Sequence, residues 1–402
     1  AEWIANRRDA DLVLVLEEAL ARRDLRSALA VLAPAQPEYQ RLRMALAQLR
    51  EAQAAGGWEG IDGGPTLREG EASPRVAQVR RRLMASTDGA ERRLAAAPDS
   101  LTESFTGELS EAVRSFQHRH GLDEDGAVGA RTLDALNVPV EVRIQQVIAN
   151  LERWRWLPHD LGARHIRVNI AAFETEVWDE GRVAMRLRSI VGRQYRMTPS
   201  FTASMRYLVV APYWHVPPNI AALDKLPEIK RDVGYLARQR FTLLDQRTND
   251  VVDPATVDWP AMTGSEFNRR YRLRQDPGPL NALGNVKFMF PNRHHVYLHD
   301  TPQRELFQRT QRDFSSGCIR IEDPMALAAF LLSGDPAWSP ATLQAAVAQG
   351  TERTIFLPEP IPVHLLYMTA FVDPEGHVHF RSDLYGRDGM VLNALAGDPP
   401  AP

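Results

Sequence analysis

The stretch Phe314-Ser315-Ser316-Gly317-Cys318-Ile319-Arg320 holds the only cysteine among the 402 residues of the chain. The cysteine follows a serine pair and a glycine, which predicts a turn rather than the apolar face of a helix. His299 lies nineteen positions earlier, at the end of the strand-like run that begins at His295. A thiol attacks as the thiolate, and its ordinary pKa of about 8.5 requires an imidazole or aligned backbone N–H groups for activation near neutral pH. The pattern predicts Cys318 as a nucleophile and His299 as its base. The alternative is that Cys318 is an inert small core residue.

The motifs around this stretch carry a family resemblance. His299-Asp300-Thr301-Pro302, followed by Ser315 to Arg320, resembles the active-site signature of the L,D-transpeptidases, cysteine enzymes with a YkuD-type catalytic domain. Many members have histidine directly before the Gly-Cys pair, whereas this chain has Ser316, as the large Gram-negative subtype does. Four further stretches look like that subtype: Tyr213 to Pro218, Asn281 to Gly284, Lys287 to Asn292 and Asp383 to Asp388.

The resemblance implies a reaction and its partners. A tetrapeptide stem of peptidoglycan is attacked at the L-to-D bond after its third residue, terminal D-alanine leaves, and a thioester forms on Cys318. The side-chain amine of a diamino acid in an acceptor stem then resolves the thioester, giving a 3→3 cross-link. A 1→3 cross-link is a variant, and water as acceptor would make the chain an L,D-carboxypeptidase. Carbapenem inhibitors are expected to acylate the same sulfur.

Acyl transfer also needs donors for the oxyanion. The backbone N–H groups of Gly317 and Cys318 are candidates, because glycine lets the backbone come close to a substrate. Tyr297 shares a strand face with His299. It is expected either to assist the oxyanion or the acceptor amine, or to be a buried aromatic residue of the sheet.

Substrate contacts are expected from side chains near the nucleophile. Arg320 would hold a carboxylate of an acidic stem peptide through bidentate pairing, or form an ion pair with Glu322 or Asp323. No cofactor is expected, and the nearby histidines lack a second cysteine or a spaced carboxylate that would complete a zinc site. The other candidates for substrate contact are Ser315, Ser316, Trp214 and Asn281.

The composition excludes several classes of protein. A hydrophobic content of 44% and a charged content of 25% are ordinary for globular proteins. The net charge of −3 gives no basic field for nucleic acid. The longest apolar run, from Met325 to Leu332, is far shorter than the roughly 20 residues of a membrane span. No leader-like segment opens the sequence, so we expect a cytoplasmic protein or a chain whose signal or anchor has been removed. The resemblance implies the Gram-negative periplasm.

The predicted fold class is α+β, with helices first and strands later. Residues 1–74 predict a helical scaffold, with one helix over 11–33 and a second from Pro37 to Gly56. From His165 the apolar periodicity changes from 3.6 to 2, which predicts a mainly antiparallel β catalytic domain. The predicted domains after the scaffold are a three-helix module at 75–140, a linking helix at 141–164, the catalytic domain at 165–388 and a tail at 389–402.

Two of these segments leave alternatives open. The 75–140 module resembles small peptidoglycan-binding modules and carries an insertion between Met84 and Ser104. It is expected either to be part of the scaffold or to bind a ligand. The interval of about 217–275 is long and polar, and insertions of this size between strands are usually functional. It is expected to form a lid or capping subdomain over the substrate cleft, or else an inert excursion.

Two rival functions remain at this point. One is a cysteine peptidase that acts on proteins, and the other is a non-catalytic peptidoglycan-binding protein with a structural Cys318. A Cys-His pair predicts a rate that depends on thiolate formation, so a flat profile from about pH 5 to 9 would count against the pair.

Overall fold

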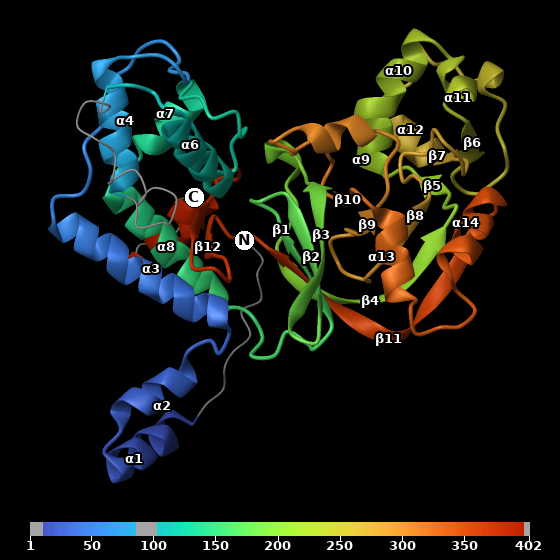
Figure 1. Cartoon of the computed structure of the whole chain (residues 1–402). Helices are drawn as coiled ribbons and strands as arrows, with labels where there is room; N and C mark the ends of the chain where they lie inside the picture. Colours follow the sequence, from blue (N-terminus) through green and yellow to red (C-terminus); the bar gives the residue numbers. More distant parts are fainter. Residues whose placement is uncertain (1–10, 86–102, 398–402) are drawn as a thin grey trace. The chain divides into compact units, whose positions relative to one another are not determined.

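The computed structural model describes residues 11–85 and 103–397 (Figure 1). Contacts divide the chain into two units, residues 162–366 and a unit formed by residues 1–161 with 367–402. The predicted catalytic domain therefore extends too far, because residues 367–388 cluster with the N-terminal helices. The physical reason is that β12 (Ala370–Val372) and β13 (Val378–Phe380) pair only with each other and do not join the other strands.

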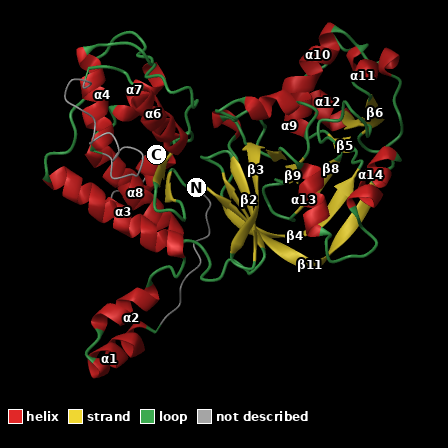
Figure 2. Ribbon diagram, viewed as in Figure 1, coloured by secondary structure: helices red, strands yellow, loops and turns green. Residues whose placement is uncertain are grey.

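The first unit is built mainly of helices (Figure 2). The helix expected over 11–33 is two helices, because Arg23 adopts a left-handed conformation with φ 56° and Asp24 caps the next helix through Ser27 N–H. The helices are α1 (Leu12–Arg22), α2 (Leu25–Leu32), α3 (Pro37–Ala54), α4 (Pro74–Met84), α6 (Gly107–His120), α7 (Ala130–Leu136), α8 (Val140–Arg155) and α15 (Arg387–Ala396).

The predicted three-helix module is present as α4, α6 and α7, which share one apolar core that includes Val79, Leu109 and Leu136. Gly121 ends α6 with φ 63°, and its N–H donates to carbonyl groups of the last turn, as expected for a helix C-cap. Most of the predicted insertion between Met84 and Ser104 lies outside the described residues.

The helix α8 joins this unit to its C-terminal strands. Asn150 is fully buried, donates to Thr369 Oγ1 at 2.7 Å and accepts from Thr369 N–H at 2.9 Å. Arg153, one turn later, forms an ion pair with Asp388 at 2.5 Å. The motif at 383–388 therefore serves the folding of the first unit.

The second unit is a closed barrel with the strand order β1-β11-β4-β8-β9-β10-β3-β2. The pairs β1/β11 and β9/β10 are parallel and the other six are antiparallel, which confirms a mainly antiparallel β domain. The strands are β1 (His165–Asn169), β2 (Glu174–Asp179), β3 (Arg182–Ile190), β4 (Phe201–Val210), β8 (Val286–Met289), β9 (Leu298–His299), β10 (Ile319–Ile321) and β11 (Arg353–Leu366).

Local sequence signals explain several features of the barrel. Glu180 and Gly181 both have positive φ in the two-residue turn between β2 and β3, which suits the twist of a hairpin. The helices α13 (Pro324–Leu331) and α14 (Pro340–Ala348) begin with an Asp323 or Ser339 cap followed by proline. Both contact barrel strands, α13 at β8 and α14 at β4.

The insertion between β4 and β8 forms a subdomain with its own core, which we call the lid. Its sheet has the order β5-β7-β6, and its core includes Trp214, Ile229, Phe267 and Leu273. The lid elements are β5 (Trp214–His215), α9 (Pro218–Ile220), the π-helical segment η4 (Ala221–Lys225), α10 (Leu226–Arg231), α11 (Tyr235–Arg238), β6 (Phe241–Asp245), η5 (Pro254–Thr256), α12 (Gly264–Arg270) and β7 (Tyr271–Gln275). Along the described parts of the chain, no helix is both long and apolar enough to cross a membrane.

Candidate active site

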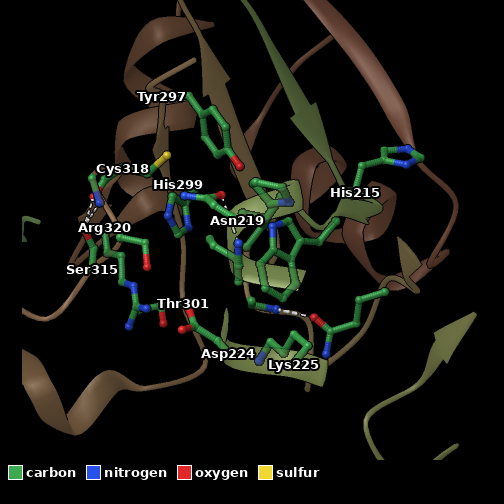
Figure 3. Close-up of a pocket in the computed structure, with 18 of the residues that line it drawn as sticks. His215, Asn219, Asp224, Lys225, Tyr297, His299, Thr301, Ser315, Cys318 and Arg320 are labelled. Atoms are coloured by element: carbon green, nitrogen blue, oxygen red, sulfur yellow. Dashed lines mark hydrogen bonds between the residues drawn. The ribbon is translucent and has the colours of Figure 1, made fainter. Parts of the chain in front are cut away.

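His299 ends β9, and Cys318 immediately precedes β10, the neighbouring strand of the barrel. The strands β9 and β10 run parallel, with Leu298 opposite Ile319 and His299 opposite Arg320, so Tyr297 lies beside Cys318. Both predicted catalytic residues line one cavity of about 1080 Å³, to which the lid and the barrel contribute residues. Figure 3 shows Cys318, His299 and Tyr297 among the residues that line this cavity. The barrel topology brings a thiol and an imidazole that are nineteen residues apart in sequence to the same cavity.

His299 is held in the tautomer that a general base requires. Its Nδ1 lies 2.5 Å from the Asp300 carbonyl oxygen, so Nδ1–H donates and Nε2 keeps its lone pair. Burial, with a smaller effect from the Arg320 charge, lowers the pKa of His299 to about 3. The ring is 5% exposed and neutral near pH 7.

The thiol of Cys318 is also neutral. Burial raises its pKa to about 11, against the opposing effects of hydrogen bonds with Tyr297 and the charge of Arg320. Its sulfur lies 3.9 Å from the His295 carbonyl oxygen, to which the thiol donates. Near neutral pH the thiol is therefore protonated, and nucleophilic attack would need a base to take its proton.

Tyr297 lies against both members of the pair. Its ring centroid is 5.6 Å from that of His299, and it lies opposite Cys318 in the register of the β9/β10 pair. The ring also packs on the lid core, and burial raises the pKa of the phenol well above its ordinary value. Tyr297 is therefore a packed aromatic residue, as the second alternative expected, and its assistance to the oxyanion or the acceptor amine stays a prediction.

The turn before Cys318 is held by the side chain of Ser315. Its hydroxyl donates to the Cys318 carbonyl at 2.5 Å and accepts from Gly317 N–H at 3.0 Å, and the residue is 2% exposed. This favours a positioning role for Ser315 over the predicted substrate contact. It also occupies the Gly317 N–H that we expected to face an oxyanion. Among the described residues no backbone acceptor for Cys318 N–H is found, so this group stays the candidate oxyanion donor.

Arg320 extends from β10 into the same cavity. It pairs with neither alternative partner, because Glu322 binds Arg188 at 2.5 Å and Asp323 caps α13. Its Nη1 donates to Gln303 at 2.7 Å, and burial lowers its pKa to about 10. Within the described residues it has no carboxylate partner, which leaves its charge available to a ligand.

The remaining predicted contacts divide into two outcomes. Trp214 lines the cavity and is 8% exposed because it also belongs to the lid core, while Ser316 lies at the cavity beside Gly317. The prediction for Asn281 is wrong. This residue is 1% exposed, does not line the cavity, and its amide nitrogen donates to the carbonyl groups of Pro212 and Asp276. Asn281 therefore links Pro212 and Asp276, the two chain segments that flank the lid.

A family model described as "L,D-transpeptidase catalytic domain" matches residues 163–338, the segment that carries the whole constellation. Residues 163–338 are therefore similar to the catalytic domains of the L,D-transpeptidase family. A model described as "Putative peptidoglycan binding domain" matches residues 73–136, and one described as "Scaffold domain" matches residues 1–46. These matches agree with the predicted order of a helical scaffold, a three-helix module and a catalytic domain.

The chain is also similar to individual known proteins. A "Putative L,D-transpeptidase" of Haemophilus influenzae is 34% identical over 247 residues, which cover 61% of this chain and 49% of that protein. The chain thus spans about half the length of this curated relative. An L,D-transpeptidase structure from Mycobacterium smegmatis matches at 13% identity and a TM-score of 0.21, covering 50% of this chain and 58% of that one. An L,D-transpeptidase structure from Stackebrandtia nassauensis matches at 10% identity and a TM-score of 0.26, covering 76% of this chain and 96% of that one.

Several residues of the candidate active site were not predicted from the sequence. Arg193, Asp224, Lys225 and His295 line the cavity beside Cys318, and Arg196 contacts the nucleophile turn. They come from a short loop after β3, from the lid and from the loop before β9. No local motif marks them, because only the closure of the barrel and the seating of the lid bring them to the thiol.

Proposed function

We propose that this chain is a peptidoglycan L,D-transpeptidase that makes 3→3 cross-links through a thioester on Cys318. The observation that carries the proposal is the placement of Cys318, His299 and Tyr297 on adjoining strands at one cavity. The match of residues 163–338 to the family of catalytic domains supports it.

The acylation step follows from the neutral pair. Nε2 of His299 takes the thiol proton while the sulfur attacks the carbonyl carbon of the third stem residue. The oxyanion forms near Cys318 N–H and the protonated Tyr297 hydroxyl. The imidazolium then protonates the nitrogen of terminal D-alanine, the C–N bond breaks, and the acyl group remains on sulfur.

The second step reverses these roles. The side-chain amine of an acceptor stem attacks the thioester carbon, and His299 accepts the proton that the amine loses. The C–S bond breaks, the sulfur leaves as thiolate and takes a proton back from His299, and an amide joins the two stems. Water in place of the amine would release the free tripeptide, which is the L,D-carboxypeptidase alternative, and a different amine would give the 1→3 variant.

The charge of the cavity supports an anionic stem as substrate. Arg193, Lys225 and Arg320 line it, while the carboxylate of Asp224 is already bound by Arg196. Stem peptides carry carboxylates, which favour such cations. The adjoining module that matches peptidoglycan-binding domains supports the same polymer as ligand, and we place the reaction in the Gram-negative periplasm, as the family resemblance implies.

Mass spectrometry of the intact protein tests the proposal directly. The wild type incubated with a carbapenem is expected to gain the mass of one inhibitor. Cys318→Ala is expected to gain none, because the chain has no other cysteine. With purified tetrapeptide muropeptides, the wild type is expected to release D-alanine and form dimers, and the variant neither.

The alternatives give other results. Cross-linking that survives in Cys318→Ala would overturn the proposal. Binding to peptidoglycan without acylation or turnover in the wild type would instead support the non-catalytic protein. D-alanine release without dimers would identify the carboxypeptidase.

A further inference from the structure

The loop between β3 and β4, residues 191–200, is hydrogen-bonded to residues 315–318, which we call the nucleophile turn. Ser315 N–H donates to the Val191 carbonyl at 2.9 Å, and Arg193 N–H donates to the Ser315 carbonyl at 3.1 Å. The hydroxyl of Thr198 donates to the Gly317 carbonyl at 2.9 Å. The backbone on both sides of Ser316 is therefore tied to residues 191–198.

Arg196 in this loop connects the turn to the lid. Its Nη1 donates to Ser316 Oγ at 2.8 Å, and its Nη1 and Nη2 bind the two carboxylate oxygens of Asp224 at 2.5 and 2.8 Å. The guanidinium side chain is 13% exposed and that of Asp224 is 39% exposed. Hydrogen bonds from Arg196 hold the pKa of Asp224 below its usual value, so the carboxylate is charged near pH 7. Two parallel bonds of this kind fix orientation as well as distance.

Asp224 belongs to η4, the π-helical segment of the lid. This segment contacts α9, α10 and α12, so its position is coupled to the helical part of the lid. Lys225, the next residue, donates to the Tyr235 hydroxyl at 3.2 Å and lines the cavity (Figure 3). A π-helical turn is rare and often marks a functional position. Here it places Asp224 against Arg196 and Lys225 at the cavity.

We propose that Arg196 is a positioning residue that makes the orientation of Cys318 depend on the position of the lid. It does so by bonding at the same time to Asp224 of the lid and to Ser316 of the nucleophile turn. This inference rests on the proposed acyl transfer to Cys318. When the lid is seated, Asp224 holds the guanidinium against Ser316, and the turn that carries the thiol is restrained. When the lid lifts, the Arg196 guanidinium loses two of its three hydrogen bonds, those to Asp224, and the turn loses this restraint. The substrate then meets an ordered nucleophile only beneath a seated lid.

Acylation kinetics of the full chain with a carbapenem test this coupling. Asp224→Asn is expected to lower the maximal acylation rate about 5- to 100-fold, the range typical of coupled sites, with a smaller change in the half-saturating concentration. Ser316→Ala, which removes only the third contact, is expected to lower the same rate by less. The reversed pair Arg196→Asp with Asp224→Arg is expected to recover part of the loss of Asp224→Asn. The matched control is Glu266→Gln, which removes an exposed ion pair with Arg270 elsewhere in the lid and is expected to leave the rate unchanged.

Limited proteolysis supplies a readout that is independent of the chemistry. Trypsin is expected to cut the lid after Lys230, Arg231 or Arg238 faster in Asp224→Asn than in the wild type or in Glu266→Gln. A wild-type maximal rate in Asp224→Asn would overturn the proposal, as would a loss confined to the half-saturating concentration. If the wild type were never acylated, the proposed function would fail, whereas the proteolysis result would still show whether this pair seats the lid.

Discussion

At the scale of single residues, burial decides how the thiol can react. The raised pKa of Cys318 keeps the sulfur protonated below about pH 11, and the lowered pKa of His299 keeps the ring neutral above about pH 3. Both shifts arise mainly from removal of water around a group that would carry charge. Near pH 7 both groups at the cavity are therefore neutral.

Burial of both groups reverses the pH profile that the sequence led us to expect, because a neutral thiol and a neutral base give a rate that no longer follows thiolate formation. The wild-type acylation rate should be nearly flat from about pH 5 to 9, because the neutral pair is fully populated across that range. In His299→Ala only the free thiolate reacts, so the residual rate should rise about tenfold per pH unit over the same range. Rates of carbapenem acylation across this range provide the measurement, with His377→Ala, a change on the first unit, as the control. A wild-type rate that climbs tenfold per unit would show direct thiolate attack instead.

At the scale of elements, the nucleophile turn depends on the conformation of one glycine. Gly317 has φ 116°, a region that residues with a side chain rarely adopt. A Cβ there would lie 3.7 Å from its nearest neighbour, the Met197 carbonyl oxygen, so space is not the constraint. The backbone torsion alone turns the chain from Ser315 into β10.

Gly317→Ala should therefore disturb presentation of the thiol without a steric clash. The strain of about 1–3 kcal/mol is expected to shift the turn and slow acylation of Cys318 at least tenfold. The control is Gly334→Ala, because a Cβ at Gly334 meets nothing within 4 Å and its φ is not positive. Acylation rates and thermal unfolding of both variants check this. A Gly317→Ala protein that reacts like the wild type would show that the turn tolerates another conformation.

At the scale of the whole molecule, the C-terminal segment returns to the first unit. Arg153 is 3% exposed, and Asp388, which follows the barrel by more than twenty residues, supplies its carboxylate partner. Thr369 donates to the same carboxylate at 2.8 Å, so the ion pair belongs to a buried polar network. Such a network is stabilising only while every member keeps its partner.

Asp388→Ala should destabilise this unit strongly. Leaving a buried guanidinium without its carboxylate is expected to cost about 3–5 kcal/mol of unfolding free energy. Denaturant unfolding followed by circular dichroism measures the change. Glu18→Gln, which removes an exposed pair with Arg22, should cost less than about 1 kcal/mol. If the two substitutions lowered the free energy of unfolding equally, the proposed contribution of the buried network to stability would be contradicted.

The sequence by itself was sufficient to predict most of the helices and strands and to select Cys318 and His299 as the candidate catalytic pair. Turn residues, helix caps and apolar periodicity act over a few positions, so the Gly317-Cys318 turn, the 180–181 hairpin and the strand-rich region after His165 could be predicted locally. Only the tertiary structure decided which strands are neighbours, because strand pairing joins residues that are distant in sequence. It thus placed His299 beside Cys318, buried both groups enough to keep them neutral, and turned Asn281 away from the cavity. It also set residues 367–388 with the helical unit, and brought Arg196, Asp224 and Ser316 together from three separate segments.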